Sequence, residues 1–206
     1  MRIVSISENQ NIEKRIAITP EITKKYISNG FEVSLSQNYG DHLGFSDEEY
    51  KKLGALILDD EKKIIESGDV VVQLGLPSDE KLSYFKENQN LVGILNPYEN
   101  KKKIENLIQK KVKNFSLELL PRITRAQSMD VLSSQANLAG YKSVIEAFSE
   151  FEKAIPMMMT AAGTVPAAKV LIIGAGVAGL QAIATAKRMG AIVFATDVRM
   201  ASKEQV

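Results

Sequence analysis

A glycine-rich segment near the carboxyl end constrains the fold more than any other part of the chain. Residues 169–179 read Lys-Val-Leu-Ile-Ile-Gly-Ala-Gly-Val-Ala-Gly, so an apolar strand leads directly into a G-x-G-x-x-G turn. A helical pattern follows from Val177 to Met189, a second apolar strand covers Ala191 to Thr196, and Asp197 stands at the end of that strand. This order of elements predicts a parallel βαβ unit of the dinucleotide-binding type.

Each glycine of this turn has its own physical role. Gly174 permits the tight turn, Gly176 lets the backbone approach a pyrophosphate, and Gly179 lets the helix pack closely on the strand. The N–H groups at Val177 and Ala178 would then face the phosphates from the positive end of the helix. The alternative is a turn that only packs a helix on a strand, and the carboxylate that follows favours a nucleotide site.

The residues after the second strand indicate which dinucleotide is bound. A carboxylate at Asp197 accepts hydrogen bonds from both ribose hydroxyls of NAD and repels the 2′-phosphate of NADP. Arg199, which follows Val198, complicates this interpretation because a nearby arginine can accommodate that phosphate. Its alternatives are an ion pair with Asp197 or a position over the adenine. The segment favours NAD(H).

The composition is that of an ordinary soluble globular protein and excludes several kinds of site. The 206 residues carry 26 Lys+Arg against 25 Asp+Glu, which argues against a broad nucleic-acid surface. Cysteine is absent, so disulfides and thiolate chemistry are excluded, and the single histidine, His42, cannot build a multi-histidine metal site. We expect His42 to be exposed or locally hydrogen-bonded. No signal peptide is recognisable, so we expect a cytoplasmic chain.

Apolar strands and helical patterns alternate along most of the sequence, which predicts mostly parallel sheets. Helical patterns are expected at 20–29, 47–53, 60–67, 78–88 and 100–111, with Ser46 as the N-cap of the second. The strands expected between them are 2–5, 31–35, 55–58, 70–74, 91–95 and 112–117.

A longer helical pattern from Gln127 to Lys153 interrupts this alternation, and a connector with glycine and proline follows at 155–168. We therefore predict an α/β protein with two doubly wound, Rossmann- or flavodoxin-like domains that contain parallel sheets and are joined by a long helix. Residues 1–126 would form the first domain, 127–168 the linking helix and connector, and 169–206 the start of the second. A dinucleotide fold needs more strands than 169–206 supplies, so we expect the second domain to be truncated.

A polar run at the start of the long helix is the second candidate site. Residues 122–130 read Arg-Ile-Thr-Arg-Ala-Gln-Ser-Met-Asp, and Ser133 follows. A purely local interpretation is available, because Thr124 and Gln127 fit a capping box and Asp130 lies near the positive end of the helix. From spacing alone, helix capping and ligand binding are equally supported.

This run, together with 157–165 and 174–199, resembles the NAD(H)-binding component of proton-translocating NAD(P) transhydrogenases. Residues 14–21, Lys-Arg-Ile-Ala-Ile-Thr-Pro-Glu, also match the amino-terminal pattern of that family. In the family, an Arg-x-x-x-x-Gln-x-x-Asp loop contacts the nicotinamide and its ribose. The resemblance implies that Gln127 holds the carboxamide, while Arg122 and Asp130 fix each other and the ribose. It places Ile123, Thr124 and Ser133 beside them.

The resemblance also implies an activity and partners. Hydride would pass directly between NAD(H) on this chain and NADP(H) on a partner component, which requires positioned rings and exclusion of water. The expected partners are membrane-embedded transhydrogenase subunits, including the NADP-binding component, and a second copy of the chain, with no nucleic acid. The chain would then lie peripherally on the inner face of the cytoplasmic membrane.

Two alternatives remain. An amino-acid dehydrogenase such as alanine dehydrogenase needs a lysine that polarises the substrate carbonyl and a histidine that moves a proton. Residues 71–77 and 91–97, the corresponding strands, contain neither, although Arg15 could bind a carboxylate. A non-catalytic NAD-binding module is the second alternative.

Overall fold

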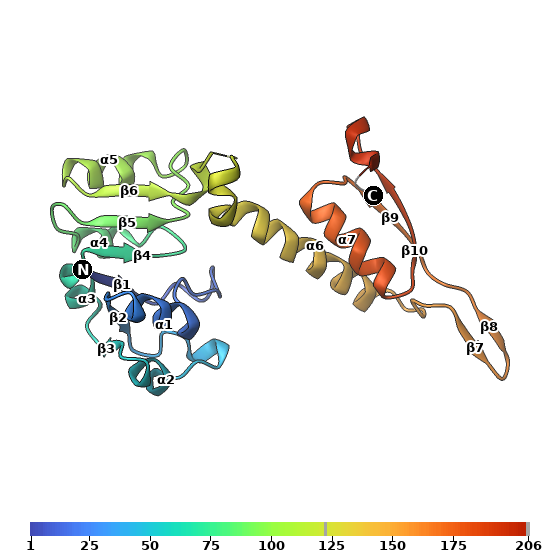
Figure 1. Cartoon of the computed structure of the whole chain (residues 1–206), viewed down its shortest axis with the longest axis horizontal. Coiled ribbons are helices and arrows are strands. Elements are labelled where there is room, and N and C mark those ends of the chain that lie inside the picture. Colours follow the sequence, from blue (N-terminus) through green and yellow to red (C-terminus); the bar gives the residue numbers. More distant parts are fainter. Residues whose placement is uncertain (122, 205–206) are drawn as a thin grey trace. The chain divides into compact units, whose positions relative to one another are not determined.

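The computed structural model describes residues 1–121 and 123–204, so Arg122 lies outside the described residues. The chain divides into two compact units, Met1–Met129 and Asp130–Val206 (Figure 1). The predicted division into 1–126, 127–168 and 169–206 stays a prediction. Across 1–121 and 123–204, no helix is both long and apolar enough to span a bilayer.

The first unit is built on a six-stranded sheet in the order β3-β2-β1-β4-β5-β6, in which every neighbouring pair is parallel. This order is that of dinucleotide-binding folds and confirms the predicted doubly wound α/β class. The strands are β1 Arg2–Ser5, β2 Glu32–Ser36, β3 Leu56–Leu58, β4 Val70–Val72, β5 Asn90–Gly93 and β6 Lys113–Ser116. The helices are α1 Pro20–Ser28, α2 Asp47–Lys52, α3 Glu61–Ser67, α4 Asp79–Ser83 and α5 Lys101–Gln109.

Side chains that alternate along the strands form two separate cores, one on each face of the sheet. Val71 of β4 belongs to a cluster with Ile64 and Ile65 of α3 and Leu107 of α5. Its neighbours in the same strand pack against the other cluster, which contains Val33 and Leu35 of β2 and residues of α1. Period-two alternation with apolar residues on both faces is expected for a parallel sheet covered by helices on both sides.

A buried tyrosine joins the amino-terminal segment to the sheet. The Tyr39 hydroxyl accepts hydrogen bonds from the backbone N–H groups of Ala17 and Ile18, at 3.1 Å each, and lies 2.8 Å from Ser5 Oγ. Its ring meets that of Tyr50 edge to face, with centroids 6.1 Å apart. Burial raises the pKa of Tyr39 to about 12, so the phenol stays neutral.

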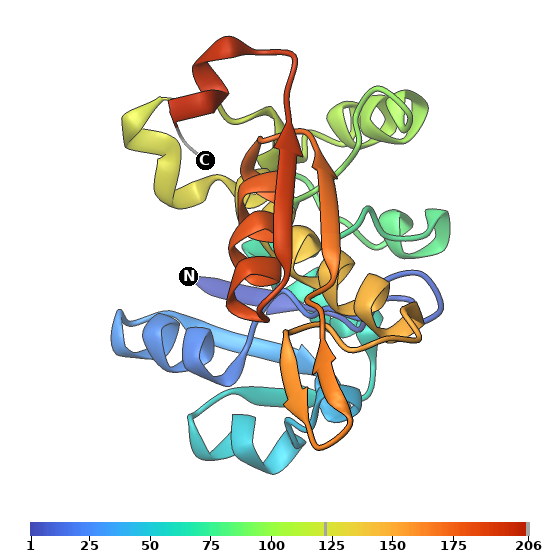
Figure 2. The same ribbon diagram turned by 90° about the vertical axis from the view of Figure 1, so that its right-hand side faces the viewer.

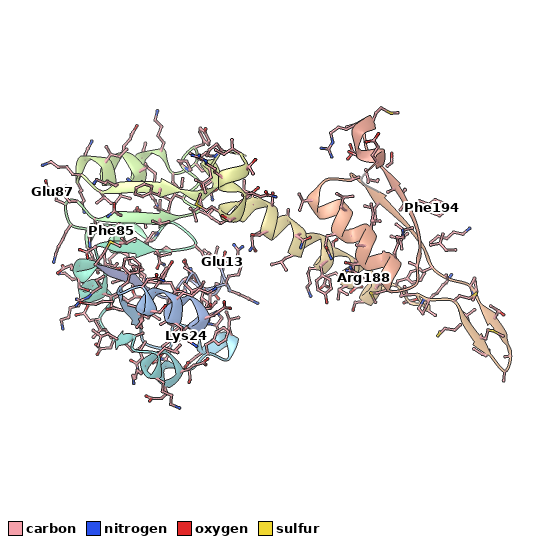
Figure 3. The ribbon with its side chains drawn as sticks, viewed as in Figure 1. Glu13, Lys24, Phe85, Glu87, Arg188 and Phe194 are labelled. Carbon is pink, nitrogen blue, oxygen red and sulfur yellow. The ribbon has the colours of Figure 1, made fainter. Side chains whose placement is uncertain are left out.

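The second unit contains the predicted βαβ element. Strands β9 Lys169–Ile173 and β10 Ile192–Thr196 are parallel and in register, and α7 Val177–Arg188 connects them (Figure 2). One face of this pair packs with Val144 of α6 Val131–Glu150 and with Ala182 and Ala186 of α7. The opposite face is exposed, and Phe194 points away from α7 (Figure 3).

Two local expectations about this part of the chain are wrong. The long helix starts at Val131, not at Gln127, and ends at Glu150, not at Lys153. Residues Thr124–Met129 form a 3-10 helix, because Asp130 is the residue that caps α6. The predicted connector contains an antiparallel hairpin of β7 Met158–Thr160 and β8 Gly163–Val165.

The Tyr39 contacts predict a specific loss of stability. Tyr39→Phe keeps the ring but leaves the N–H groups of Ala17 and Ile18 buried without their acceptor, so the free energy of unfolding should fall by about 1–3 kcal/mol. Urea denaturation followed by circular dichroism measures this change. Tyr98→Phe is the matched control, because Tyr98 is 87% exposed and should lose nothing measurable. Equal stability of the two variants would contradict the role of the Tyr39 hydroxyl.

Candidate functional site

The glycine-rich turn has the geometry that the fingerprint predicts. Gly174 follows β9 with φ +98, and its N–H donates to the carbonyl of Thr196 at 2.7 Å, which joins the turn to the end of β10. A Cβ at Gly179 would lie 1.7 Å from the Gly174 carbonyl oxygen, so no side chain fits there. The first turn of α7 therefore lies directly against the strand end.

The amino end of α7 is open toward a ligand. Its N-cap, Gly176, supplies no side-chain acceptor, so the first backbone N–H groups of the helix, at Val177 and Ala178, lack a side-chain cap among the described residues. These groups and the helix dipole favour an anion. A phosphate of a dinucleotide has the chemistry that this end of the helix can stabilise.

Asp197 lies beside the turn and is hydrogen-bonded within the chain. Its carboxylate accepts from Ala175 N at 2.7 Å, from Arg199 N at 2.8 Å and from the Arg199 guanidinium at 3.0 and 3.1 Å. These bonds, those from Arg199 first, hold the pKa of Asp197 well below its usual range. Of the alternatives for Arg199, the structure shows the ion pair. Val198 between them is fully exposed.

A cavity of about 380 Å³ opens next to this carboxylate, within the size range of small-molecule sites. Sequence reasoning predicted two of its lining residues and missed the others, which come from the turn, from β10 and from the 3-10 helix Met200–Glu204 that follows it. The lining residues are Ala175, Ala195, Thr196, Asp197, Arg199, Met200 and Ser202.

The predicted nicotinamide-binding residues divide between the two units. Gln127 is exposed on the 3-10 helix of the first unit, with Ile123 and Thr124 also exposed. Asp130 caps α6 in the second unit, since it accepts from Ser133 N at 2.9 Å and Ser133 Oγ at 2.7 Å. The local interpretation is therefore correct for Asp130, and the capping box of Thr124 and Gln127 does not start the helix. Contact of these residues with a nicotinamide stays a prediction.

Gly140 is a residue of this region whose role sequence reasoning missed. It lies in the middle of α6, and a Cβ there would stand 2.0 Å from the carbonyl oxygen of Ala178 in the first turn of α7. The two helices therefore cross at backbone contact, immediately beside the open N-terminus. A glycine inside a strong helical pattern was the available signal.

Histidine and metal chemistry do not contribute to this site. His42 is exposed and lies 2.7 Å from the carbonyl oxygen of Lys14 through Nε2, which confirms the local role expected for it. The part of the chain that the structure describes holds no group of three or more His, Cys, Asp or Glu side chains arranged to bind a metal.

The parallel fold and the open turn with its carboxylate define a class: α/β proteins that bind NAD(H). The model of the alanine dehydrogenase/PNT amino-terminal domain matches residues 5–139, and that of the carboxyl-terminal domain matches residues 143–206. The chain belongs to the alanine dehydrogenase/PNT family of oxidoreductases.

Curated relatives narrow the comparison within this family. The chain is 47% identical to the first of the NAD(P) transhydrogenase alpha subunit polypeptides of Rickettsia prowazekii and 48% identical to that of Rhodospirillum rubrum. Both matches cover the whole chain and 55% of the relative, so the chain spans about half the length of these proteins.

Solved structures agree with the relatives. The transhydrogenase from Sinorhizobium meliloti matches 99% of this chain and 61% of its own, with a TM-score of 0.93 and 49% identity. An L-alanine dehydrogenase has a TM-score of 0.84 at 23% identity over the whole of this chain and 57% of its own, and shares the fold.

The crossing at Gly140 predicts the effect of a single methyl group. Gly140→Ala adds a Cβ that must push α7 away from α6, at a cost of about 1–3 kcal/mol. That cost opposes and should exceed the gain of about 1 kcal/mol from alanine in a helix. Thermal unfolding should show a lower midpoint for this variant. Ser134→Ala, at an exposed position of the same helix, is the control and should not lower the midpoint. A midpoint for Gly140→Ala at or above that of the unmodified chain would overturn the contact.

Proposed function

We propose that this chain is the NAD(H)-binding part of a proton-translocating transhydrogenase. Hydride would pass directly between NAD(H) here and NADP(H) on a partner component. The open amino end of α7 beside Asp197, in a chain 47–48% identical to transhydrogenase alpha subunits, carries this proposal. The expected partners are the membrane-embedded subunits and the NADP-binding component, with the chain as a homodimer on the inner face of the cytoplasmic membrane. The word "subunit" in the names of the relatives supports dependence on further chains.

The residues at the site fit a dinucleotide along its length. Gly174, Gly176 and Gly179 leave room for phosphates, which the N–H groups of Val177 and Ala178 would bind. Asp197, Val198 and Arg199 border the cavity or its rim, where the adenosine would lie. The residues proposed for the nicotinamide end are Arg122, Ile123, Thr124, Gln127, Asp130 and Ser133.

Positioning is the chemical task that these residues would perform. Bound NAD(H) supplies the hydride, and no proton moves at the reacting carbon. Gln127 would orient the ring through its carboxamide, since a primary amide offers both a donor and an acceptor. Ser133 holds Asp130 by two hydrogen bonds, so the carboxylate has a fixed direction toward the ribose and toward Arg122.

The structure disfavours the dehydrogenase alternative. The strand ends where that reaction would place a lysine and a histidine hold Gln73 and Asn96. Gln73 is 3% exposed, and its amide oxygen accepts from Ser5 Oγ and Ile6 N. Its amide nitrogen donates to Glu8 Oε1 at 3.1 Å. The side chain is thus fully used in holding the ends of β1 and β4 together. Arg15, the possible carboxylate ligand, forms an ion pair with Glu13 at 2.6 Å.

A decisive test measures hydride transfer by stopped-flow absorbance. The longest natural chain that contains these residues is mixed with the NADP-binding component of a relative, NADH and an NADP⁺ analogue. Rapid transfer that requires both proteins is expected. Absence of transfer above the rate of either protein alone, with NADH bound, would leave the non-catalytic module as the better description.

The role of Gln127 predicts a separation of binding from chemistry. Gln127→Asn shortens the side chain by one methylene, so the ring should be misplaced and transfer slowed by up to about 100-fold. NADH affinity, measured by fluorescence, should change little because the phosphates and adenosine supply most contacts. Gln109→Asn makes the same change at an exposed position of α5 and should leave both quantities unchanged. A large loss of affinity with normal turnover would refute the positioning role.

A further inference from the structure

The acceptor positions of Asp197 are filled by donors of the chain itself. Oδ1 accepts from Arg199 N at 2.8 Å and Arg199 Nε at 3.0 Å, while Oδ2 accepts from Ala175 N at 2.7 Å and Arg199 Nη2 at 3.1 Å. A carboxylate offers about four lone-pair positions. The ribose hydroxyls of NAD(H), which would donate to this group, therefore meet an occupied acceptor.

The four donors differ in how easily they can leave. Ala175 N is held in the turn between Gly174, whose N–H is bonded to Thr196, and the start of α7. Arg199 N is backbone and lies only two residues from the carboxylate. The guanidinium ends a long side chain that is 61% exposed, whereas the Asp197 side chain is 9% exposed. Exposed ion pairs of this kind contribute little stability, so the guanidinium is the donor that a ligand can replace.

We propose that the Arg199 guanidinium occupies the adenosine-ribose site of the empty protein and is displaced by the two ribose hydroxyls. The proposal rests on the proposed function only in taking this cavity as an NAD(H) site. Departure of Nε frees one position on Oδ1, and departure of Nη2 frees one on Oδ2. One hydroxyl can then donate to each oxygen, while Ala175 N and Arg199 N keep the carboxylate oriented.

Displacement also makes Arg199 a specificity-determining residue. A hydroxyl can replace an N–H donor on the carboxylate, because it brings a proton of its own. A 2′-phosphate brings acceptor oxygens and negative charge, so it cannot replace the guanidinium there. The pair with Asp197 also keeps the guanidinium from serving as a free phosphate ligand.

The sign of one affinity change separates this role from a simpler one. If Arg199 competes with the ribose, Arg199→Gln removes the competitor, and both NADH and ADP-ribose should bind roughly two- to fivefold more tightly. NADPH should bind no more tightly, because the uncompensated carboxylate repels its 2′-phosphate. If Arg199 instead contacts the bound cofactor as a cation, the same change should weaken all three ligands. Arg199→Lys keeps the charge without the two-donor fork and should bind ADP-ribose with intermediate affinity.

Titration calorimetry with ADP-ribose, NADH and NADPH measures these affinities. It is carried out on the chain and on the same chain continued by the downstream part of the Rickettsia prowazekii relative. Arg188→Gln, at the opposite end of α7, is the control for a general loss of positive charge (Figure 3). Circular dichroism checks that each variant is folded. In parallel, ¹⁵N NMR follows the Arg199 Nε–H, which should be protected from solvent exchange in the free protein and lose that protection on saturation with ADP-ribose.

Each outcome decides the proposal. Tighter ADP-ribose binding by Arg199→Gln, unchanged binding by Arg188→Gln and loss of Nε–H protection support displacement. Equal or weaker ADP-ribose binding by Arg199→Gln, or an Nε–H that stays protected in the complex, overturns it. Absence of ADP-ribose binding in both forms of the chain overturns it together with the NAD(H) site. If ADP-ribose binds in the expected order but hydride transfer fails, the transhydrogenase function alone is refuted.

Discussion

The contact between Gly179 and the Gly174 carbonyl oxygen is the constraint on which the second unit depends. A side chain at residue 179 would lie 1.7 Å from that oxygen, so only glycine lets α7 begin this close to the end of β9. The same turn brings the N–H of Ala175 within 2.7 Å of Asp197 on the neighbouring strand. The position of the carboxylate and the direction of the helix end are therefore consequences of one backbone contact.

This constraint extends to the helix that packs on α7. Because Gly140 places α6 at backbone distance from Ala178, the first turn of α7 is confined between the strand end on one side and α6 on the other. Val144, Ala182 and Ala186 bury the rest of this helix pair. A helix end confined in this way keeps its unpaired N–H groups in a fixed direction, which is what binding of a phosphate requires.

Much of the fold could be predicted because each buried strand is a short apolar run and the helices end at recognisable signals. Strands at 2–5 and 169–173 and the N-cap at Ser46 are found as predicted. The start of the long helix was misplaced because two caps compete within seven residues. Asp130 prevails through two hydrogen bonds from Ser133, one of which no capping-box pattern describes. The hairpin at 158–165 was missed because its strands are mostly exposed and carry no alternation of apolar and polar residues.

The candidate site was predictable in its residue types and not in their interactions. The spacing placed Asp197 beside the turn, but an ion pair and a free ribose ligand have the same three-residue sequence. The difference matters for a protein that, under the proposed function, must accept NAD(H) while NADP(H) is present. A lone carboxylate would discriminate by repulsion, which salt weakens. A carboxylate already bonded to a guanidinium discriminates by exchange of donors, because hydroxyls can replace N–H groups and a phosphate cannot. That requirement depends on short-range hydrogen-bond geometry, so it should persist at ionic strengths that screen the charges.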